Sequence, residues 1–170
     1  MDFHLQQYFH YLSQATPDAY ATMYGSASYP NIYGNVYFYS MQKGSLVCVT
    51  VNGLPYQSDI CSSRFFGFHI HEGMSCKNTA ESISKKEFFP FVSGHLNPNN
   101  CIHPQHVGDL PSLLGNNGYA FSVFYSNQFT PEMVVGHTII LHHMPDDFHS
   151  QPSGNSGEKI ACGEIQVFSL

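Results

Sequence analysis

The segment GFHIH at residues 67–71 alternates apolar and histidine side chains, and the interpretation of the whole chain begins there. Successive side chains of a β-strand point to opposite faces, so Phe68 and Ile70 are expected to enter a core. His69 and His71 then project together from the other face, roughly 7 Å apart, which lets both imidazoles bind one ion at about 2.0–2.1 Å. The alternative is a polar outer strand face that happens to contain two histidines.

Short runs of β-branched and aromatic residues continue on both sides of this segment, from Asn31 onward. Turn residues separate them, which is typical of a β-sandwich or barrel. The runs predict six strands, Asn35–Ser40, Ser45–Asn52, Arg64–His71, Tyr119–Tyr125, Gly136–His142 and Lys159–Phe168. Two long stretches interrupt them, Glu72–Gly118 and His143–Glu158. Loops of that length are uncommon unless something orders them and they have a function.

The chain has 170 residues, about one domain, and with 42% hydrophobic and 11% charged residues it is too apolar to be disordered. We divide it into an N-terminal extension, residues 1–28, and a β-rich domain, residues 29–170. Apolar residues at loosely helical spacing before Pro17 predict a short helix over about residues 3–14.

The charge pattern excludes some partners. A formal net charge of −6 argues against duplex nucleic acid, which binds basic surfaces. No stretch approaches the roughly 20 apolar residues that cross a bilayer, so no membrane partner is expected. Residues 1–20 contain no Lys or Arg for the basic end of a signal peptide. We therefore expect a cytoplasmic protein, and an extracytoplasmic location stays open.

A second histidine cluster lies in the first long stretch, with His95, His103, His106 and Asp109. Three imidazoles and one carboxylate are a complete tetrahedral ligand set for Zn²⁺. With so few apolar residues, the loop is not expected to order itself by burial, and bound metal would supply the missing free energy. The alternative is four scattered polar residues.

A third histidine, His142, ends the predicted strand in which Ile139 and Leu141 share one face. Asp146 and Asp147 follow within reach as acceptors for an imidazole N–H. The remaining histidines are expected at the surface or receive no role: His137, His143, His149, His4 and His10.

The residues resemble the copper/zinc superoxide dismutase family from about Asn31 to Val167, in motifs that keep the family's order. These are GFHIHE at 67–72, GHLNP at 94–98, His103, HVGDL at 106–110, VGHT at 135–138 continuing to His142 and Asp146, and GNSGEKIACG at 154–163.

The resemblance implies an all-β fold, an eight-stranded antiparallel Greek-key β-barrel (an immunoglobulin-like sandwich) with two long loops that hold the metals outside it. It implies copper and zinc as cofactors and His95 as a bridge between them. The implied copper ligands are His69, His71, His95 and His142, and the implied zinc ligands are His95, His103, His106 and Asp109. Asp146 matches the carboxylate that bonds a copper and a zinc ligand, here His69 and His103. Cys76 and Cys162 match the family's disulfide.

The implied activity is superoxide dismutation, in which two superoxide anions and two protons give O₂ and hydrogen peroxide. His95 would accept a proton when copper is reduced. Lys159 corresponds to the family's anion-guiding arginine; it keeps the charge but loses the planar fork. The alternative is a dismutase-like protein that binds or stores copper and zinc with little turnover.

Other features depart from the family. The interval from His103 to His106 and the second long loop are short, as in a short-loop, bacterial-like member, and residues 77–92 are an insertion without an evident role. Cys61 and Cys101 either form a second bridge or stay free, and Cys48 is expected as a buried thiol. A homodimer is one of the oligomeric states that the family allows.

Overall fold

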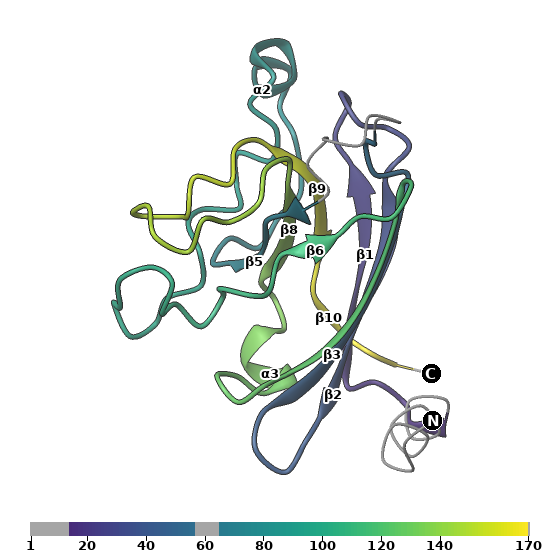
Figure 1. Ribbon diagram of the computed structural model, residues 1–170, viewed down its shortest axis with the longest axis vertical. Helices are drawn as coiled ribbons and strands as arrows, with labels where there is room; N and C mark the ends of the chain where they lie inside the picture. Colours follow the sequence, from purple (N-terminus) through teal and green to yellow (C-terminus); the bar gives the residue numbers. More distant parts are fainter. Residues whose placement is uncertain (1–13, 57–64, 170) are drawn as a thin grey trace.

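The computed structural model describes residues 14–56 and 65–169 of the protein (Figure 1). Its main sheet has eight strands, and the strands of each ladder run antiparallel. In spatial order the strands are β5 (Phe68–His71), β8 (Thr138–His142), β9 (Lys159–Glu164), β1 (Ala19–Gly25), β2 (Tyr33–Ser40), β3 (Ser45–Asn52) and β7 (Tyr119–Ser126), with β10 (Gln166–Val167) paired to β1.

The sheet curls into a half-barrel, and two short strands form a separate sheet: β4 (Phe65–Phe66) and β6 (Leu113–Leu114). β3 and β7 are neighbours although the chain forms β4, β5 and β6 between them, which is a Greek-key connection. The all-β, barrel-type fold is therefore confirmed. Among the described residues no helix is both long and apolar enough to span a bilayer.

The core lies on the concave side of this sheet, where alternate residues of each strand point inward. In β5 the prediction holds, because Phe68 and Ile70 are fully buried in the core. In β8 Ile139 and Leu141 share that core, as predicted. Burying such apolar side chains contributes about 1.5–3 kcal/mol each, so the core fixes the strands from which the histidines project.

One strand lies where the sequence placed the extension. Ala19–Gly25 forms β1, between β9 and β2, so the boundary at residue 28 is wrong for this part. The sequence AYATMYG does alternate, with Ala19, Ala21 and Met23 buried, but alanines give a weak apolar signal. The helix predicted over residues 3–14 lies outside the described residues except for its last position.

Two of the predicted strands are each divided into two shorter strands. Arg64–His71 becomes β4 and β5, separated at Gly67, whose added Cβ would lie 2.7 Å from Ser156 Oγ. Lys159–Phe168 becomes β9 and β10, separated at Ile165, which is buried and donates its backbone N–H to His137. In both places packing of the flanking loop overrides the propensity of the run.

The first long loop is partly ordered by burial, contrary to the expectation. Leu96, Val107, Leu110 and Leu113 are all buried in the main core, and Leu113 belongs to β6. The spacing of these four residues follows no helical or strand period, so their burial could not be predicted from the sequence.

The insertion at residues 77–92 docks on β8 and β9. It contains α2 (Ala80–Lys85), which starts with a capping box between Thr79 and Ser82. The chain then packs Phe88, Phe89 and Val92 against Ile140 and Cys162. The Cys76–Cys162 disulfide that the resemblance implies ties the insertion to β9. A further short helix is α3 (Pro131–Val134).

The remaining cysteines differ from the expectation in one case. Cys48 is half-buried, not buried, because it lies on the outward face of β3. Burial raises the pKa of its thiol. Cys101 is a free, half-buried thiol, and Cys61 lies outside the described residues.

Candidate metal centre

The backbone brings two loop residues onto β5. Isolated antiparallel bridges pair His71 with His95 and His69 with Asp109. Gly108 makes this approach possible, because a Cβ there would lie 2.1 Å from the carbonyl oxygen of Ile70. The loop therefore delivers an imidazole and a carboxylate to the strand that already carries two histidines.

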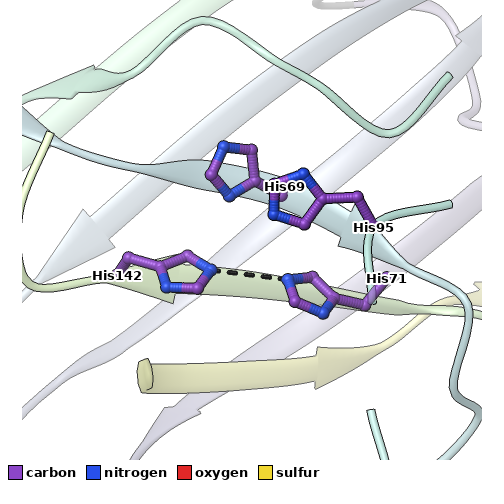
Figure 2. A group of neighbouring side chains, drawn as sticks. All are labelled: His69, His71, His95 and His142. Carbon is purple, nitrogen blue, oxygen red and sulfur yellow. Dashed lines mark hydrogen bonds between the residues drawn. The ribbon is translucent and has the colours of Figure 1, made fainter. Parts of the chain in front are cut away.

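The first group joins the two histidines of β5 to the loop histidine and to the end of β8. Its ligand atoms all lie within 4.8 Å of one another, and Figure 2 shows the four rings gathered in one place. The members of the first group are His69, His71, His95 and His142. His71 Nε2 and His142 Nε2 lie 3.4 Å apart.

Each ring of the first group is held through its other nitrogen. His71 Nδ1 donates to the carbonyl oxygen of Ser93 (2.9 Å), and His142 Nδ1 to that of Gly157 (3.1 Å). His69 Nε2 donates to Asp146 (2.7 Å). Such bonds fix the tautomer and the orientation of a ligand, so the free nitrogens face the group.

The second group shares one ring with the first and is completed by three loop residues, namely His95, His103, His106 and Asp109. His103 Nδ1 and His106 Nδ1 lie 3.1 and 3.3 Å from Asp109 Oδ2, and His95 Nδ1 lies 2.7 Å from Asp109 Oδ1. Ligand atoms of a tetrahedral ion with bonds of about 2.0–2.1 Å are roughly 3.3 Å apart. The two distances to Asp109 Oδ2 match this spacing, whereas the 2.7 Å contact of His95 Nδ1 with Asp109 Oδ1 is a hydrogen bond.

Unpaired buried nitrogens test whether metals fit here. Among the described residues, four ring nitrogens are buried without a hydrogen-bond partner: His69 Nδ1, His95 Nε2, His103 Nδ1 and His106 Nδ1. Two of them lie near Asp109 but lack hydrogen-bond geometry. An unsatisfied buried polar group costs about 1–3 kcal/mol. Two cations, one in each group, satisfy all four nitrogens, so the residues fit copper and zinc.

Asp146 links the two groups. It accepts from His69 Nε2 through one oxygen and from His103 Nε2 through the other, at 2.7 and 2.9 Å. These are the two rings that the resemblance implies. Burial by itself would raise the pKa of Asp146, but the hydrogen bonds from His69, the Phe148 N–H and His103 lower it well below its usual range. Asp147 bonds Ser150 instead.

Burial acts in the opposite sense on the rings of the first group. Burial, together with the smaller effect of neighbouring imidazoles, lowers the pKa of His71 far below its ordinary value and that of His142 to about 3. Burial also lowers the pKa of His69, although the hydrogen bond with Asp146 acts to raise it. Neutral imidazole is the form that binds metal, so the fold prepares these ligands.

A pocket of about 650 Å³ opens over the first group. His71, His95 and His142 line it, whereas His103, His106 and Asp109 do not. An incoming small molecule therefore reaches the first group, while the side chains that only the second group contains, those of His103, His106 and Asp109, are buried.

Lys159 lines this pocket, as expected for a residue that guides an anion. It pairs with His142 across the β8–β9 ladder and is half-buried. Burial lowers its pKa, and the nearby Glu87 carboxylate opposes that shift.

Sequence reasoning missed two charged residues of the pocket. Lys86 and Glu87 follow α2 in the insertion and line the pocket mouth together with Glu158. Nothing in the local sequence of 77–92 marks them, because the packing of Phe88 and Phe89 on Ile140 places them there. The surface histidines behave as expected: His143 and His149 are exposed, and His137 Nδ1 donates to the carbonyl oxygen of Glu72.

The fold and the centre define a β-barrel metalloprotein in which one histidine can bridge two ions. The family model of copper/zinc superoxide dismutase (SODC) matches residues 32–165. The chain belongs to this family, whose members are oxidoreductases that use copper and zinc and act on the small anion superoxide.

Named relatives agree with this assignment. "Superoxide dismutase [Cu-Zn] 2" of Aquifex aeolicus is 29% identical over 146 residues, covering 79% of this chain and 80% of the relative. "Superoxide dismutase [Cu-Zn]" of Deinococcus radiodurans is 30% identical over 139 residues, covering 74% and 72%. "Superoxide dismutase [Cu-Zn] 4" of Dictyostelium discoideum is 32% identical over 142 residues, covering 76% and 87%.

Proposed function

We propose that this chain is a superoxide dismutase that consumes superoxide in the pocket over the first group. Two superoxide anions and two protons give one O₂ and one hydrogen peroxide. The observation that carries the proposal is the asymmetry of access: the four-histidine group meets the pocket beside Lys159, and the carboxylate-containing group is closed off.

The first group would hold copper and the second zinc, with His95 in both. Copper bound there would supply the one-electron redox chemistry of the reaction, because its Cu(II) and Cu(I) states differ by one electron. Four imidazoles suit copper, and three imidazoles with a carboxylate suit zinc.

Lys159 attracts and positions the anion. Its ammonium is a point charge on the pocket wall, in a partly desolvated place where its field is stronger than in bulk water. The whole chain carries a net charge of −6 and so repels an anion at long range. The local positive field of Lys159 is therefore what directs superoxide toward the first group.

His95 handles the proton. Its Nδ1 faces Asp109, while its Nε2 is buried, free of other partners among the described residues, and on the side of the first group. When no ion holds Nε2, this nitrogen can carry a proton to the pocket that the anion enters.

The proposal is tested by loading the protein with copper and zinc and measuring superoxide consumption by pulse radiolysis. We expect one copper and one zinc per chain and a rate far above that of the metal-free protein. Stoichiometric copper without that rate contradicts the enzyme and supports a metal-binding or storage protein. The carboxylates of Glu87 and Glu158 favour this second candidate, because they offset the two pocket lysines.

Lys159→Arg sharpens the test. The guanidinium keeps its charge at high pH, so we expect a rate a few-fold higher, a steeper fall with salt, and an alkaline decline that moves upward in pH. In the natural protein the decline should begin below pH 10.5, because burial lowers the pKa of Lys159 from that value. Unchanged rate and salt dependence would mean that residue 159 does not act on the substrate.

We also propose that the chain forms a homodimer. Exposed aromatic side chains on the outward faces of β1, β2 and β7 support this, namely Tyr24, Tyr33, Phe121 and Tyr125.

A further inference from the structure

One glutamine of the second long loop holds the backbone of a ligand histidine. Gln151 Oε1 accepts from the backbone N–H of His103 at 3.0 Å, and Gln151 Nε2 donates to the carbonyl oxygen of His103 at 2.7 Å. A side-chain amide carries both a donor and an acceptor, so Gln151 bonds both backbone polar groups of His103, as a residue of a neighbouring antiparallel strand would. We call these two hydrogen bonds the Gln151 clamp.

The same loop also holds the ring of His103. Asp146 Oδ1 accepts from His103 Nε2 at 2.9 Å. Gly154 lies directly against this contact, because a Cβ there would lie 2.7 Å from His103 Nε2. The carbonyl oxygen of Gly154 accepts from the backbone N–H of Asp147 at 2.9 Å, which closes the loop on itself. Residues 146–154 therefore fix both the ring and the backbone of this one ligand.

The other ligands of the second group are supported in a different way. Isolated bridges pair His95 and Asp109 with β5. His106 is followed directly by Val107, which is buried in the main core. Sheet contacts and burial therefore determine where these three ligands lie.

His103 lies in a part of the chain that burial of its neighbours does not hold. Ile102 is 66% exposed, and Pro104 on the other side is also exposed. The ring of His103 is nevertheless enclosed, with its Nδ1 at 3.1 Å from Asp109 Oδ2. Ordering a backbone segment costs conformational entropy, and a contact that orders it before an ion arrives reduces what is lost on binding.

We propose that Gln151 is a positioning residue for the second group, because it holds the backbone of His103 where the ring can serve as a ligand. The Gln151 clamp strengthens zinc binding and slows zinc release. This rests on the proposed placement of zinc in the second group, and it does not depend on superoxide consumption. His103 takes no part in the first group, so copper binding there should not depend on the clamp.

The test is a zinc titration of the metal-free protein in competition with a chromogenic chelator, followed by a copper titration with zinc saturating. In Gln151→Met we expect the dissociation constant of zinc to rise about tenfold, the lower end of what loss of an outer hydrogen-bond partner costs. Methionine has a similar length but no N–H donor and no carbonyl acceptor. The dissociation constant of copper should not change.

Gln105→Met is the matched control. Gln105 is the same residue type in the same loop as His103, it is exposed, and its side chain bonds no ligand in the part of the chain that the structure describes. This variant should bind both metals as the natural chain does. If Gln151→Met does not fold, as judged by circular dichroism of the metal-free protein, Gln151→Ser repeats the test with a smaller side chain.

Unchanged zinc affinity in Gln151→Met overturns the clamp. A loss of copper affinity equal to that of zinc also overturns it, because Gln151 would then only pack the loop. The same zinc loss in Gln105→Met overturns it as well, since any glutamine of these loops would be equivalent. A natural chain that binds zinc with the expected dependence on Gln151 but consumes no superoxide contradicts only the proposed function and supports the clamp.

Discussion

The two ligand groups share His95 but are held in place by different chemistry. In the first group the rings of His71 and His142 are fixed by backbone carbonyls and line the pocket. In the second group a carboxylate, Asp109, lies among the ligands, and neither Asp109 nor His103 nor His106 lines that pocket.

This difference separates two tasks. Hydrogen bonds from His95 and the His106 N–H outweigh burial and lower the pKa of Asp109, so the second group keeps an anion that would attract a dication. The open group would hold its metal with neutral rings, so no negative charge on a ligand would repel the substrate anion. Removing or weakening each feature in turn tests the comparison.

The largest effect is expected from His142→Ala. Only the first group loses a ligand, so copper affinity should fall by more than the roughly 10–100-fold that removal of an outer hydrogen-bond partner costs. Zinc should stay at one per chain, because His142 is not in the second group. Metal content by mass spectrometry and copper titration measure both.

His137→Ala is the matched control, because His137 precedes β8 and takes no part in either group. It should bind both metals normally. Equal loss of zinc and copper in His142→Ala would show that the two groups are not separable and that the histidines mainly order the loops.

Asp146→Asn should weaken both groups together. An amide offers one acceptor oxygen and one donor NH₂, so it cannot accept from both His69 and His103. We expect roughly a 10–100-fold loss of affinity for copper and for zinc. Isothermal titration with each metal measures it.

Asp147→Asn changes the same residue type one position along, where the carboxylate is exposed and bonds Ser150. Its metal affinities should not change. A selective loss of one metal in Asp146→Asn would mean that Asp146 serves one group only.

Acid should destabilise the metal-free protein in a defined pH window. The pKa of His142 is about 3 in the fold against 6.5 in the unfolded chain, and that of His71 is lowered in the same direction. The unfolded state therefore binds more protons below pH 6.5, and folding stability falls as the pH drops from 6.5 toward 3, by about 1.4 kcal/mol per pH unit for each such group. Urea unfolding at several pH values measures the slope.

His142→Gln removes one titrating ring and should flatten that slope by one group's share. Copper and zinc compete with protons for the same nitrogens, so the loaded protein should resist acid to a lower pH. A metal-free protein with constant stability from pH 6.5 to 4.5 would show that the rings are not kept neutral by burial.

Sequence reasoning works best where the signal is local. The alternation at residues 67–71 places Phe68 in the core and His69 beneath the loops, as the structure has it. The two ligand groups combine residues from separate strands and loops, and predicting them required the family motifs. The spacing of residues within a loop does not show which strand the loop contacts. The bridge of His71 to His95 is such a long-range contact.

Sequence reasoning fails where contacts between distant parts of the chain determine the structure. The sequence does not predict β1, because its buried positions include Ala19 and Ala21, whose small side chains give a weak apolar signal. The role of the insertion depends on Phe88 and Phe89 packing against Ile140, about fifty residues away, and no local pattern encodes that contact.

The smallest expected effect tests the insertion. Lys86 caps the C-terminal end of α2 with a positive φ of 57°, lines the pocket and is exposed, whereas Lys159 is half-buried. Lys86→Gln removes its charge, so we expect the rate constant for superoxide to fall about two- to threefold at low salt and to match the natural protein at high salt, where screening removes the field.

Lys85→Gln is the control, since Lys85 pairs with Glu81 at 2.7 Å and does not line the pocket. Equal losses in both variants would assign the effect to net charge, whereas a loss in Lys86→Gln alone places the insertion among the parts that direct the anion to the open group.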